Sequence, residues 1–232
     1  MHPIICRIGP FNIYSWGFMV AAAFIAGLFA GLKYAKREGI TAEHTIDLFM
    51  YVLVSSIIGA RLFYVIGFFP EYRQNPISIL SINQGGMVFL GGVFGGIAAL
   101  MAYCRYRRIN VWKMLDAATP SVAIGYAIGR IGCLLNGCCY GITLFGFRQP
   151  TQIYSSIAGL IIFLLLVRLY NKKRYDGQIF LLGLSFYSLY RFFIEFLRYS
   201  PLHIFIFTPS QLISAMILLF SIYTLWKKNT TS

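Results

Sequence analysis

Among the charged side chains inside segments that are otherwise apolar, five are candidates for function: Arg61, Asp116, Arg130, Arg191 and Glu195. A charge within a bilayer costs about 2.5–3.5 kcal/mol on insertion scales, so such residues face a protein interior or a wet cavity and are candidates for function. Asp116 follows Lys113 by one helical turn, which predicts an interfacial charge with a structural role. The other four residues, three arginines and one glutamate, are candidates for a site that binds an anion.

The four candidates carry an excess of positive charge. Arg191 and Glu195 are four residues apart and share one helix face, so a purely structural ion pair is an alternative to a site. Arg61 has no acidic neighbour in its own segment and needs a partner from elsewhere, either Glu195 or a ligand anion. A guanidinium is a planar fork that suits phosphate oxygens. We therefore predict a site for a phospholipid phosphate, with arginines bonded to backbone carbonyls as the alternative.

The segment GYAIGRIGCLLNGCCYG, residues 125–141, contains the densest group of candidates. Its first three glycines recur at helical spacing and leave one face thin enough for a helix or a lipid to approach. Arg130 projects from that face, and Asn136 follows near the end of the segment.

A second glycine cluster has six glycines in residues 85–96. So many glycines disfavour a regular helix through backbone entropy. A helix that began there would present free backbone N–H groups to an anion. We predict phospholipid contacts at Gly85, Gly86, Gly91 and Gly92, although close packing of helices explains the pattern nearly as well.

The five cysteines do not form a disulfide framework, because their number is odd and three lie in one segment. The spacing of Cys133, Cys138 and Cys139 matches no metal motif, so we predict neither a metal site nor a cofactor. Cys133 follows Arg130 by three residues, which allows a stabilised thiolate, and a small buried cysteine is the alternative. The histidines, His2, His44 and His203, lie outside the apolar segments, so no general base is predicted.

The composition assigns the broad class. Of 232 residues, 58% are hydrophobic and 12% charged, against about 45–50% and 25% in soluble domains. This excludes a cytosolic enzyme, a secreted disulfide scaffold and a disordered chain. A bilayer core needs roughly 20 apolar residues per helix. Seven segments qualify: 15–35, 46–69, 86–104, 114–136, 152–170, 178–197 and 209–226. We predict one all-α integral membrane domain over residues 1–232, whose first apolar segment is retained and not cleaved as a signal peptide.

Basic residues concentrate in the loops after the first, third and fifth segments and in the C-terminal tail. The positive-inside rule makes these loops cytoplasmic, with the N-terminus outside and the C-terminus inside. The net charge of +13 then reflects loops that face anionic lipid, not nucleic acid. The polar residues 70–84 fall outside and could lie along the membrane surface.

Several motifs occur in a specific order along the chain: Gly59-Ala60-Arg61, Gly85-Gly86-Met87, GRIG at 129–132, Asn136-Gly137 with Gly141, PTQIY at 150–154, and RFFIEFLR at 191–198. In this order they resemble the prolipoprotein diacylglyceryl transferase family of bacterial inner-membrane enzymes, and the resemblance runs nearly end to end. Seven spans with the N-terminus outside also fit that family.

The resemblance implies transfer of the diacylglyceryl group of phosphatidylglycerol to the lipobox cysteine thiol of a prolipoprotein, giving a thioether and glycerol phosphate. It implies partners in that lipid and in the signal-peptide region, and an active site toward the outer leaflet of the inner membrane. Carried over by residue, it makes Arg130 and Arg191 catalytic or phosphate-binding, with Asn136 and Gly141 in the same site. Glu195 would orient the arginines. The supporting residues would be Gln152, Tyr154 and Cys133.

The chain departs from the family pattern at several positions. The histidine of HGGL is Leu90, the asparagine of GRxGN is Cys133, the acidic residue after NG is Cys138 and the histidine of HPxQ is Gln149. The segment between Gly141 and Gln149 is also short. Three functions therefore stay open: the family reaction by another route to the thiolate, a paralogue with a different acceptor, and a non-catalytic phospholipid-binding or transport protein. A transporter would show related halves, and no internal repeat is visible.

Overall fold

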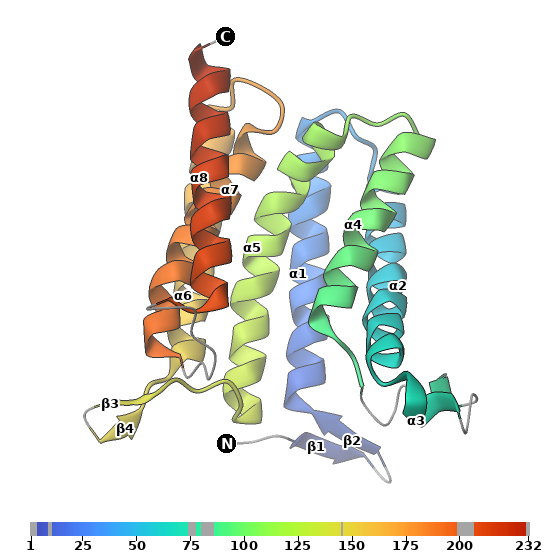
Figure 1. Ribbon diagram of the computed structural model, residues 1–232. Coiled ribbons are helices and arrows are strands. Elements are labelled where there is room, and N and C mark those ends of the chain that lie inside the picture. The colour runs from blue at the N-terminus through green and yellow to red at the C-terminus, as the bar shows by residue number, and fades with distance from the viewer. Residues whose placement is uncertain are drawn as a thin grey trace. The chain divides into compact units, whose positions relative to one another are not determined.

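The computed structural model describes residues 4–8, 11–73, 78–79, 86–144, 146–198 and 207–230. Within these residues, seven helices are long and apolar enough to cross a membrane (Figure 1). They are α1 (Ser15–Arg37), α2 (Ala42–Gly67), α4 (Phe89–Tyr106), α5 (Val111–Asn136), α6 (Thr151–Tyr170), α7 (Gln178–Ile194) and α8 (Pro209–Thr230). The all-α membrane class and each predicted crossing segment are confirmed.

Shorter elements lie between the crossing helices. They are the hairpin of β1 (Ile4–Ile8) and β2 (Phe11–Tyr14), the helix α3 (Phe69–Arg73), the hairpin of β3 (Thr143–Leu144) and β4 (Phe147–Arg148), and the 3₁₀ turn η3 (Glu195–Leu197). Strands this short show too little alternation to be predicted from sequence. Most of the polar segment 70–84 lies outside the described residues, so its path along the membrane surface stays a prediction.

The chain forms two compact units, one from residues 1–34 with 115–232 and one from residues 35–114. The first contains most of α1 and α5 and all of α6, α7 and α8. The second contains α2, α3 and α4. The single domain expected from the sequence stays a prediction.

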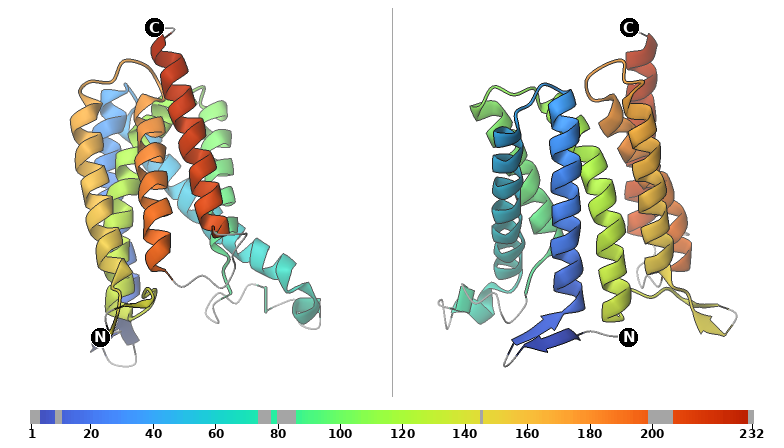
Figure 2. Two further views of the ribbon diagram at one scale, coloured as in Figure 1. Left: turned by 60° about the vertical axis from the view of Figure 1, so that its left-hand side comes forward. Right: turned by 180° about the vertical axis from the view of Figure 1, so that it is seen from behind.

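Successive helices of the first unit run in opposite directions and pack through small residues. Gly132 of α5 lies against Met19 and Trp16 at the start of α1. At the other end of α1, the centres of the Tyr34 and Tyr170 rings lie 4.6 Å apart. In this unit α7 contacts both α6 and α8 and lies between them (Figure 2). This arrangement gathers the ends of α5 and α7 and the beginnings of α6 and α8 at one end of the unit.

Asp116 fixes the beginning of α7. Its carboxylate accepts hydrogen bonds from the backbone N–H groups of Gly177, at 2.7 Å, and Phe180, at 2.8 Å, and it lies 2.9 Å from Nζ of Lys173. A carboxylate here satisfies two of the free N–H groups of a helix N-terminus. Asp116 is fully buried within the protein, and its contacts are those of a structural cap, in agreement with the predicted structural role. Its position at the membrane interface stays a prediction.

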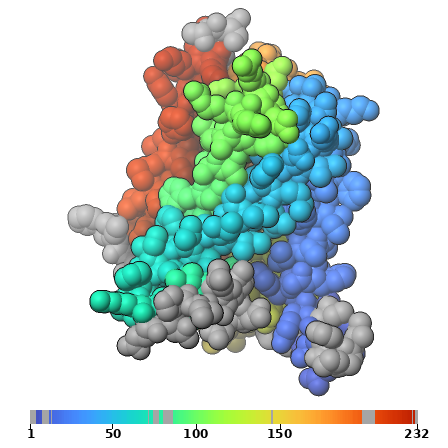
Figure 3. Space-filling view, turned by 90° about the vertical axis from the view of Figure 1, so that its right-hand side faces the viewer, coloured from blue at the N-terminus to red at the C-terminus, as the bar shows by residue number. Residues whose placement is uncertain are grey.

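The second unit is built on the packing of α2 against α4 (Figure 3). A Cβ at Gly91 would collide with the Gly59 carbonyl and Phe63, and one at Gly95 with the backbone of α2. The glycines therefore let two helix backbones touch. The expectation that they disfavour a regular helix is wrong, since α4 runs unbroken from Phe89.

Candidate active site

Three arginines lie in connected parts of the first unit. Arg130 of α5 lies over the ring of Tyr126, which meets the ring of Tyr187 on α7, and Arg191 of α7 and Arg198 just after η3 both lie within ion-pair distance of Glu195. The one carboxylate within ion-pair distance of these arginines, among the described residues, is that of Glu195. With Glu195 ionised, three positive charges face one negative charge, which makes this part of the unit suited to an anion.

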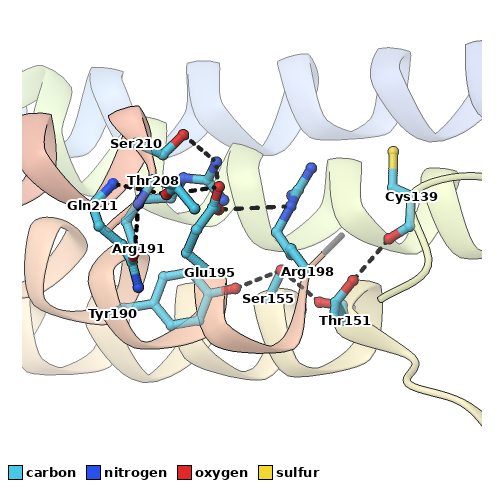
Figure 4. Close-up of polar contacts among 10 residues, drawn as sticks. All are labelled: Cys139, Thr151, Ser155, Tyr190, Arg191, Glu195, Arg198, Thr208, Ser210 and Gln211. Atoms are coloured by element: carbon cyan, nitrogen blue, oxygen red, sulfur yellow. Dashed lines mark hydrogen bonds and ion pairs between the residues drawn. The ribbon is translucent and has the colours of Figure 1, made fainter. Parts of the chain in front are cut away.

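Glu195 joins two of the arginines (Figure 4). Its Oε2 lies 3.1 Å from Nη2 of Arg191 and 3.9 Å from Nε of Arg198, and its Oε1 accepts a hydrogen bond of 3.4 Å from the hydroxyl of Thr208. The α-helix tightens to 3₁₀ geometry at Glu195, which brings the residue three positions later to the same carboxylate. The predicted pair of Arg191 with Glu195 is confirmed.

Arg198 was not predicted as a site residue. The signal was present, because Arg198 follows Glu195 by three residues in RFFIEFLR and residues at that spacing are neighbours on a helix. Its place at the end of an apolar segment made it look like a charge of the adjoining loop.

The beginning of α8 is fixed beside this cluster by a capping box. The backbone N–H of Thr208 donates to Oε1 of Gln211 at 2.9 Å, and the N–H of Gln211 donates to the Thr208 hydroxyl at 3.3 Å. Pro209 occupies the first helical position, as is common at this point. The next residue, Ser210, accepts a hydrogen bond of 3.4 Å from Nη2 of Arg191. The start of one helix thus holds the arginine and the glutamate of another.

Arg130 lies over one aromatic ring, which itself packs against a second. Its guanidinium carbon lies 4.8 Å from the centre of the Tyr126 ring, and the Tyr126 and Tyr187 rings meet edge to face at 5.6 Å. No carboxylate lies within ion-pair distance of Arg130 in the part of the chain that the structure describes. A cation over a ring keeps its charge available, so Arg130 can still bind an anion.

A chain of hydrogen bonds connects α7 through α6 to the loop after α5 (Figure 4). The Tyr190 hydroxyl donates to Oγ of Ser155 at 2.5 Å, and Ser155 donates to the Thr151 carbonyl at 2.6 Å. The Thr151 hydroxyl donates to the Cys139 carbonyl at 2.7 Å. Next to it, Nε2 of Gln152 donates to the Cys138 carbonyl at 2.5 Å. The PTQIY motif therefore positions the loop.

Gly141 joins that loop to the end of η3. A Cβ there would collide with the Leu197 carbonyl oxygen and with Thr151, and the Gly141 N–H donates to the Gln149 carbonyl at 2.9 Å. The side chain of Gln149 in turn accepts a hydrogen bond of 3.1 Å from the Tyr154 hydroxyl. Tyr154 thus supports the loop as well. Asn136 lies exposed at the last residue of α5.

The pKa of the Cys139 thiol depends on two of the same arginines. Partial desolvation raises its pKa above the ordinary value, and the neighbouring thiol of Cys138 adds to the rise, while Arg130 and Arg198 oppose it. Cys133 lies beside both, since the three sulfur atoms are all within 4.8 Å of one another.

Arg61 belongs to the second unit and is bonded to backbone carbonyls. It donates to the backbone carbonyls of Ile79 at 2.9 Å, Ser78 at 2.8 Å and Gly86 at 3.0 Å. These are the backbone carbonyl partners that the sequence left open as the alternative to a phosphate site. The contact of Arg61 with phospholipid stays a prediction.

The predicted glycines of the second cluster lie in the same unit as Arg61. A Cβ at Gly86 would collide with the Arg61 side chain, and Gly91 and Gly92 pack against α2. Gly85 lies outside the described residues. A role for these glycines in phospholipid binding stays a prediction.

The comparison with protein families agrees with the motifs. A family model described as prolipoprotein diacylglyceryl transferase matches residues 3–227. The chain belongs to this family. Three relatives named phosphatidylglycerol–prolipoprotein diacylglyceryl transferase match over most of their length. The protein of Clostridium botulinum (strain Langeland) is 33% identical over 97% of this chain and 96% of its own. That of Finegoldia magna is 34% identical over 90% and 88%, and that of Lactiplantibacillus plantarum is 30% identical over 99% and 90%.

Membership in the prolipoprotein diacylglyceryl transferase family, together with seven crossing helices, makes this a multi-pass bacterial membrane protein. Of the residues that the resemblance placed in the site, Arg191 and Glu195 form an ion pair, Arg130 lies over the Tyr126 ring, and Gly141 lies in the loop bonded to the end of η3. The described residues of the first unit include no histidine, and His2 and His203 lie outside the described part of the chain.

Proposed function

We propose that this protein transfers the diacylglyceryl group of phosphatidylglycerol to the lipobox cysteine thiol of a prolipoprotein. The observation that carries the proposal is a group of three arginines with one carboxylate among the described residues: Arg191 and Arg198 share Glu195, and Arg130 lies over an uncharged ring, in a chain that belongs to this transferase family. An anionic lipid is the substrate that such a cluster within a membrane protein suits best.

The reaction exchanges one bond at carbon. The thiol sulfur attacks the diacylglyceryl carbon that bears the phosphate ester, the bond between that carbon and the ester oxygen breaks, and the electron pair leaves with glycerol phosphate. The thiol proton is released. Negative charge grows on the phosphate as it leaves, so guanidinium groups directed at its oxygens stabilise the transition state more than the ground state. Glu195 acts through Arg191 and Arg198 and is a positioning residue.

The glycerol of the head group can be recognised near the same loop. Oε1 of Gln152 is buried and accepts no hydrogen bond from any described residue, while the amide nitrogen of this side chain is bound to Cys138. A buried acceptor without a donor is costly. A head-group hydroxyl that donates to Gln152 would remove this cost, which gives a reason for a preference for phosphatidylglycerol.

The thiol can react without a histidine. A free thiol has a pKa of about 8.5, so a few per cent is thiolate at neutral pH, and nearby arginines raise this fraction in a bound substrate. A general base adds about 10²–10⁴ in rate. We expect an active enzyme that is slower than one with such a base, placed in the cytoplasmic membrane with its site toward the outer leaflet.

The test uses purified full-length protein, phosphatidylglycerol and a synthetic lipobox peptide, with mass spectrometry to detect the diacylglyceryl adduct. A peptide with serine in place of the lipobox cysteine is the matched control, and phosphatidylethanolamine is the control donor. An adduct formed only with cysteine and only with phosphatidylglycerol supports the proposal. Release of glycerol phosphate without a peptide adduct contradicts it and indicates another acceptor. Lipid binding without any release indicates a binding protein.

A further inference from the structure

Three thiols that the proposed transfer does not use gather where α5 ends. The sulfur atoms of Cys133, Cys138 and Cys139 all lie within 4.8 Å of one another, and those of Cys138 and Cys139 are 3.6 Å apart. Thiolates are soft ligands that favour zinc and copper(I) over harder ions.

The way α5 ends explains two of the three positions. Gly137 has a φ of +76°, its N–H donates to the Leu134 carbonyl at 3.1 Å, and the Cys138 N–H donates to the Cys133 carbonyl at 3.1 Å. This is a Schellman motif, in which the side chains at the positions of Cys133 and Cys138 regularly meet. The helix end therefore brings the first two sulfurs together.

The third sulfur is placed by unusual backbone geometry. Cys139 has a φ of +66°, a region that residues with a Cβ seldom occupy. The buried side chains of Thr151 and Gln152 bind the carbonyls of Cys139 and Cys138. Two side chains from α6 thus hold the backbone that turns the third thiol toward the other two.

We infer that Cys133, Cys138 and Cys139 form a binding site for a zinc ion. A zinc–sulfur bond of about 2.3 Å in tetrahedral geometry needs sulfur atoms about 3.8 Å apart. One separation is already 3.6 Å, and the others are at most 4.8 Å, so small rotations of the side chains complete the set.

A disulfide between Cys138 and Cys139 suits the geometry less well. The Cα atoms of adjacent residues such as Cys138 and Cys139 lie about 3.8 Å apart across a trans peptide, and disulfides usually need about 4.4–6.8 Å. Charge also favours the ion, because three thiolates around a dication leave one net negative charge. Arg130 and Arg198 act electrostatically on Cys139 and can offset it.

The site would have an open fourth position. Zinc with three protein ligands leaves one position for an outside ligand, and Cys139 is exposed. On the proposed function, this position takes the lipobox thiol, which loses its proton to water on binding. The zinc-bound sulfur then attacks the diacylglyceryl carbon, glycerol phosphate leaves with the electron pair, and the zinc ion is unchanged. This step rests on the proposed function, whereas binding of the ion does not.

The test measures zinc binding by the reduced full-length protein in detergent. We expect one zinc ion per chain by elemental analysis, and a thiolate-to-metal charge-transfer absorption when cobalt(II) replaces zinc. Each of Cys133→Ser, Cys138→Ser and Cys139→Ser should weaken binding by more than about 10-fold. Cys6→Ser, which removes an exposed thiol on β1, should leave binding unchanged.

A second measurement needs no variant and so does not depend on a variant's folding. Zinc should protect the three cysteines from alkylation in the wild-type protein, mapped by mass spectrometry, and should leave Cys6 unprotected. Absence of zinc binding, equal zinc binding by the triple serine variant, uptake of copper(I) without zinc, or a disulfide among the three cysteines would each overturn the inference.

The transfer assay separates this inference from the proposed function. Zinc binding without any transfer contradicts the function and leaves the metal site standing. Transfer that is unchanged after chelation overturns the role of zinc in activating the thiol and leaves the function standing. Transfer that falls on chelation and returns with zinc supports both.

Discussion

Glu195 lies 3.1 Å from Arg191 and, through the 3₁₀ turn that begins at it, also 3.9 Å from Arg198. A single buried carboxylate thus orients two guanidinium groups without neutralising both. The remaining positive charge, together with that of Arg130, is available to a substrate anion. The following predictions test this arrangement and the elements that support it.

Replacing either main arginine should stop transfer while the protein still inserts in the membrane. Loss of one donor that stabilises developing charge typically costs about 10²–10³ in rate, so we expect at least this loss for Arg130→Ala and Arg191→Ala. The lysine variants should also fail, because an ammonium is a point charge and cannot form two parallel bonds to phosphate. Arg148→Ala, on the exposed β4 strand, is the control. The rate of adduct formation measures the effect. Full activity in a lysine variant would refute a bidentate contact between the guanidinium and the phosphate.

Glu195→Gln should lower the maximal rate more than it changes the apparent affinity for phosphatidylglycerol, because the arginines keep their charge and lose their orientation. It should also destabilise the protein. Removing one partner of a fully buried ion pair costs about 3–5 kcal/mol, and the Arg191 side chain is 21% exposed, so the lower end is expected. Thermal unfolding and a full kinetic analysis check this. A loss of affinity alone would mean that Glu195 does not act by positioning.

Two glycines of the segment 125–141 should respond differently to alanine. A Cβ at Gly141 would collide with the Leu197 carbonyl, whereas one at Gly129 meets nothing within 4 Å. Gly141→Ala should therefore displace the loop from the end of η3 and lower both stability and transfer. Gly129→Ala, inside α5, should be neutral or slightly stabilising because alanine favours a helix by about 1 kcal/mol over glycine. Equal effects of the two changes would show that the loop contact is unimportant.

Features that lie within one helix could be predicted from the sequence, whereas contacts that depend on the path of a loop could not. Long apolar segments predicted all seven crossing helices, because bilayer thickness limits each one separately. The pair of Arg191 and Glu195 was predictable because both lie on one helix. The carbonyl partners of Arg61 and the three-thiol cluster were not. They depend on how loops turn, and the one available signal, a glycine after Asn136, indicates a helix end without showing which side chains then meet.

The stability of the α6–α7 loop should fall in alkaline solution through Tyr175. Burial raises the pKa of this phenol, and the carboxylate of Asp116 adds to the rise. The folded state then holds the proton more tightly than the unfolded chain. The stabilisation is complete below the ordinary tyrosine pKa of about 10 and is lost as pH rises through the higher folded value. Tyr175→Phe should reduce the alkaline decrease in melting temperature, and Tyr106→Phe, at an exposed site, should not. An equal decrease in both variants would contradict this assignment.

The last prediction concerns Leu90, at the position where the resemblance places a histidine. Leu90 lies in the first turn of α4, and its side chain is 54% exposed, so a larger polar side chain can be accommodated there. In protein freed of metal ions, the lipobox thiol has to ionise by itself, and we expect the transfer rate to rise with pH toward the thiol pKa of about 8.5. If Leu90 faces the pocket, Leu90→His should then accelerate the reaction at neutral pH, by up to the roughly 10²–10⁴-fold typical of a general base, and flatten the pH profile. Leu90→Gln, which is polar but cannot take up a proton near neutral pH, is the matched control. Equal acceleration by glutamine and histidine would mean that polarity, not proton transfer, limits the rate. A flat profile in the wild-type protein, without a gain from histidine, would show that thiol ionisation does not limit this enzyme.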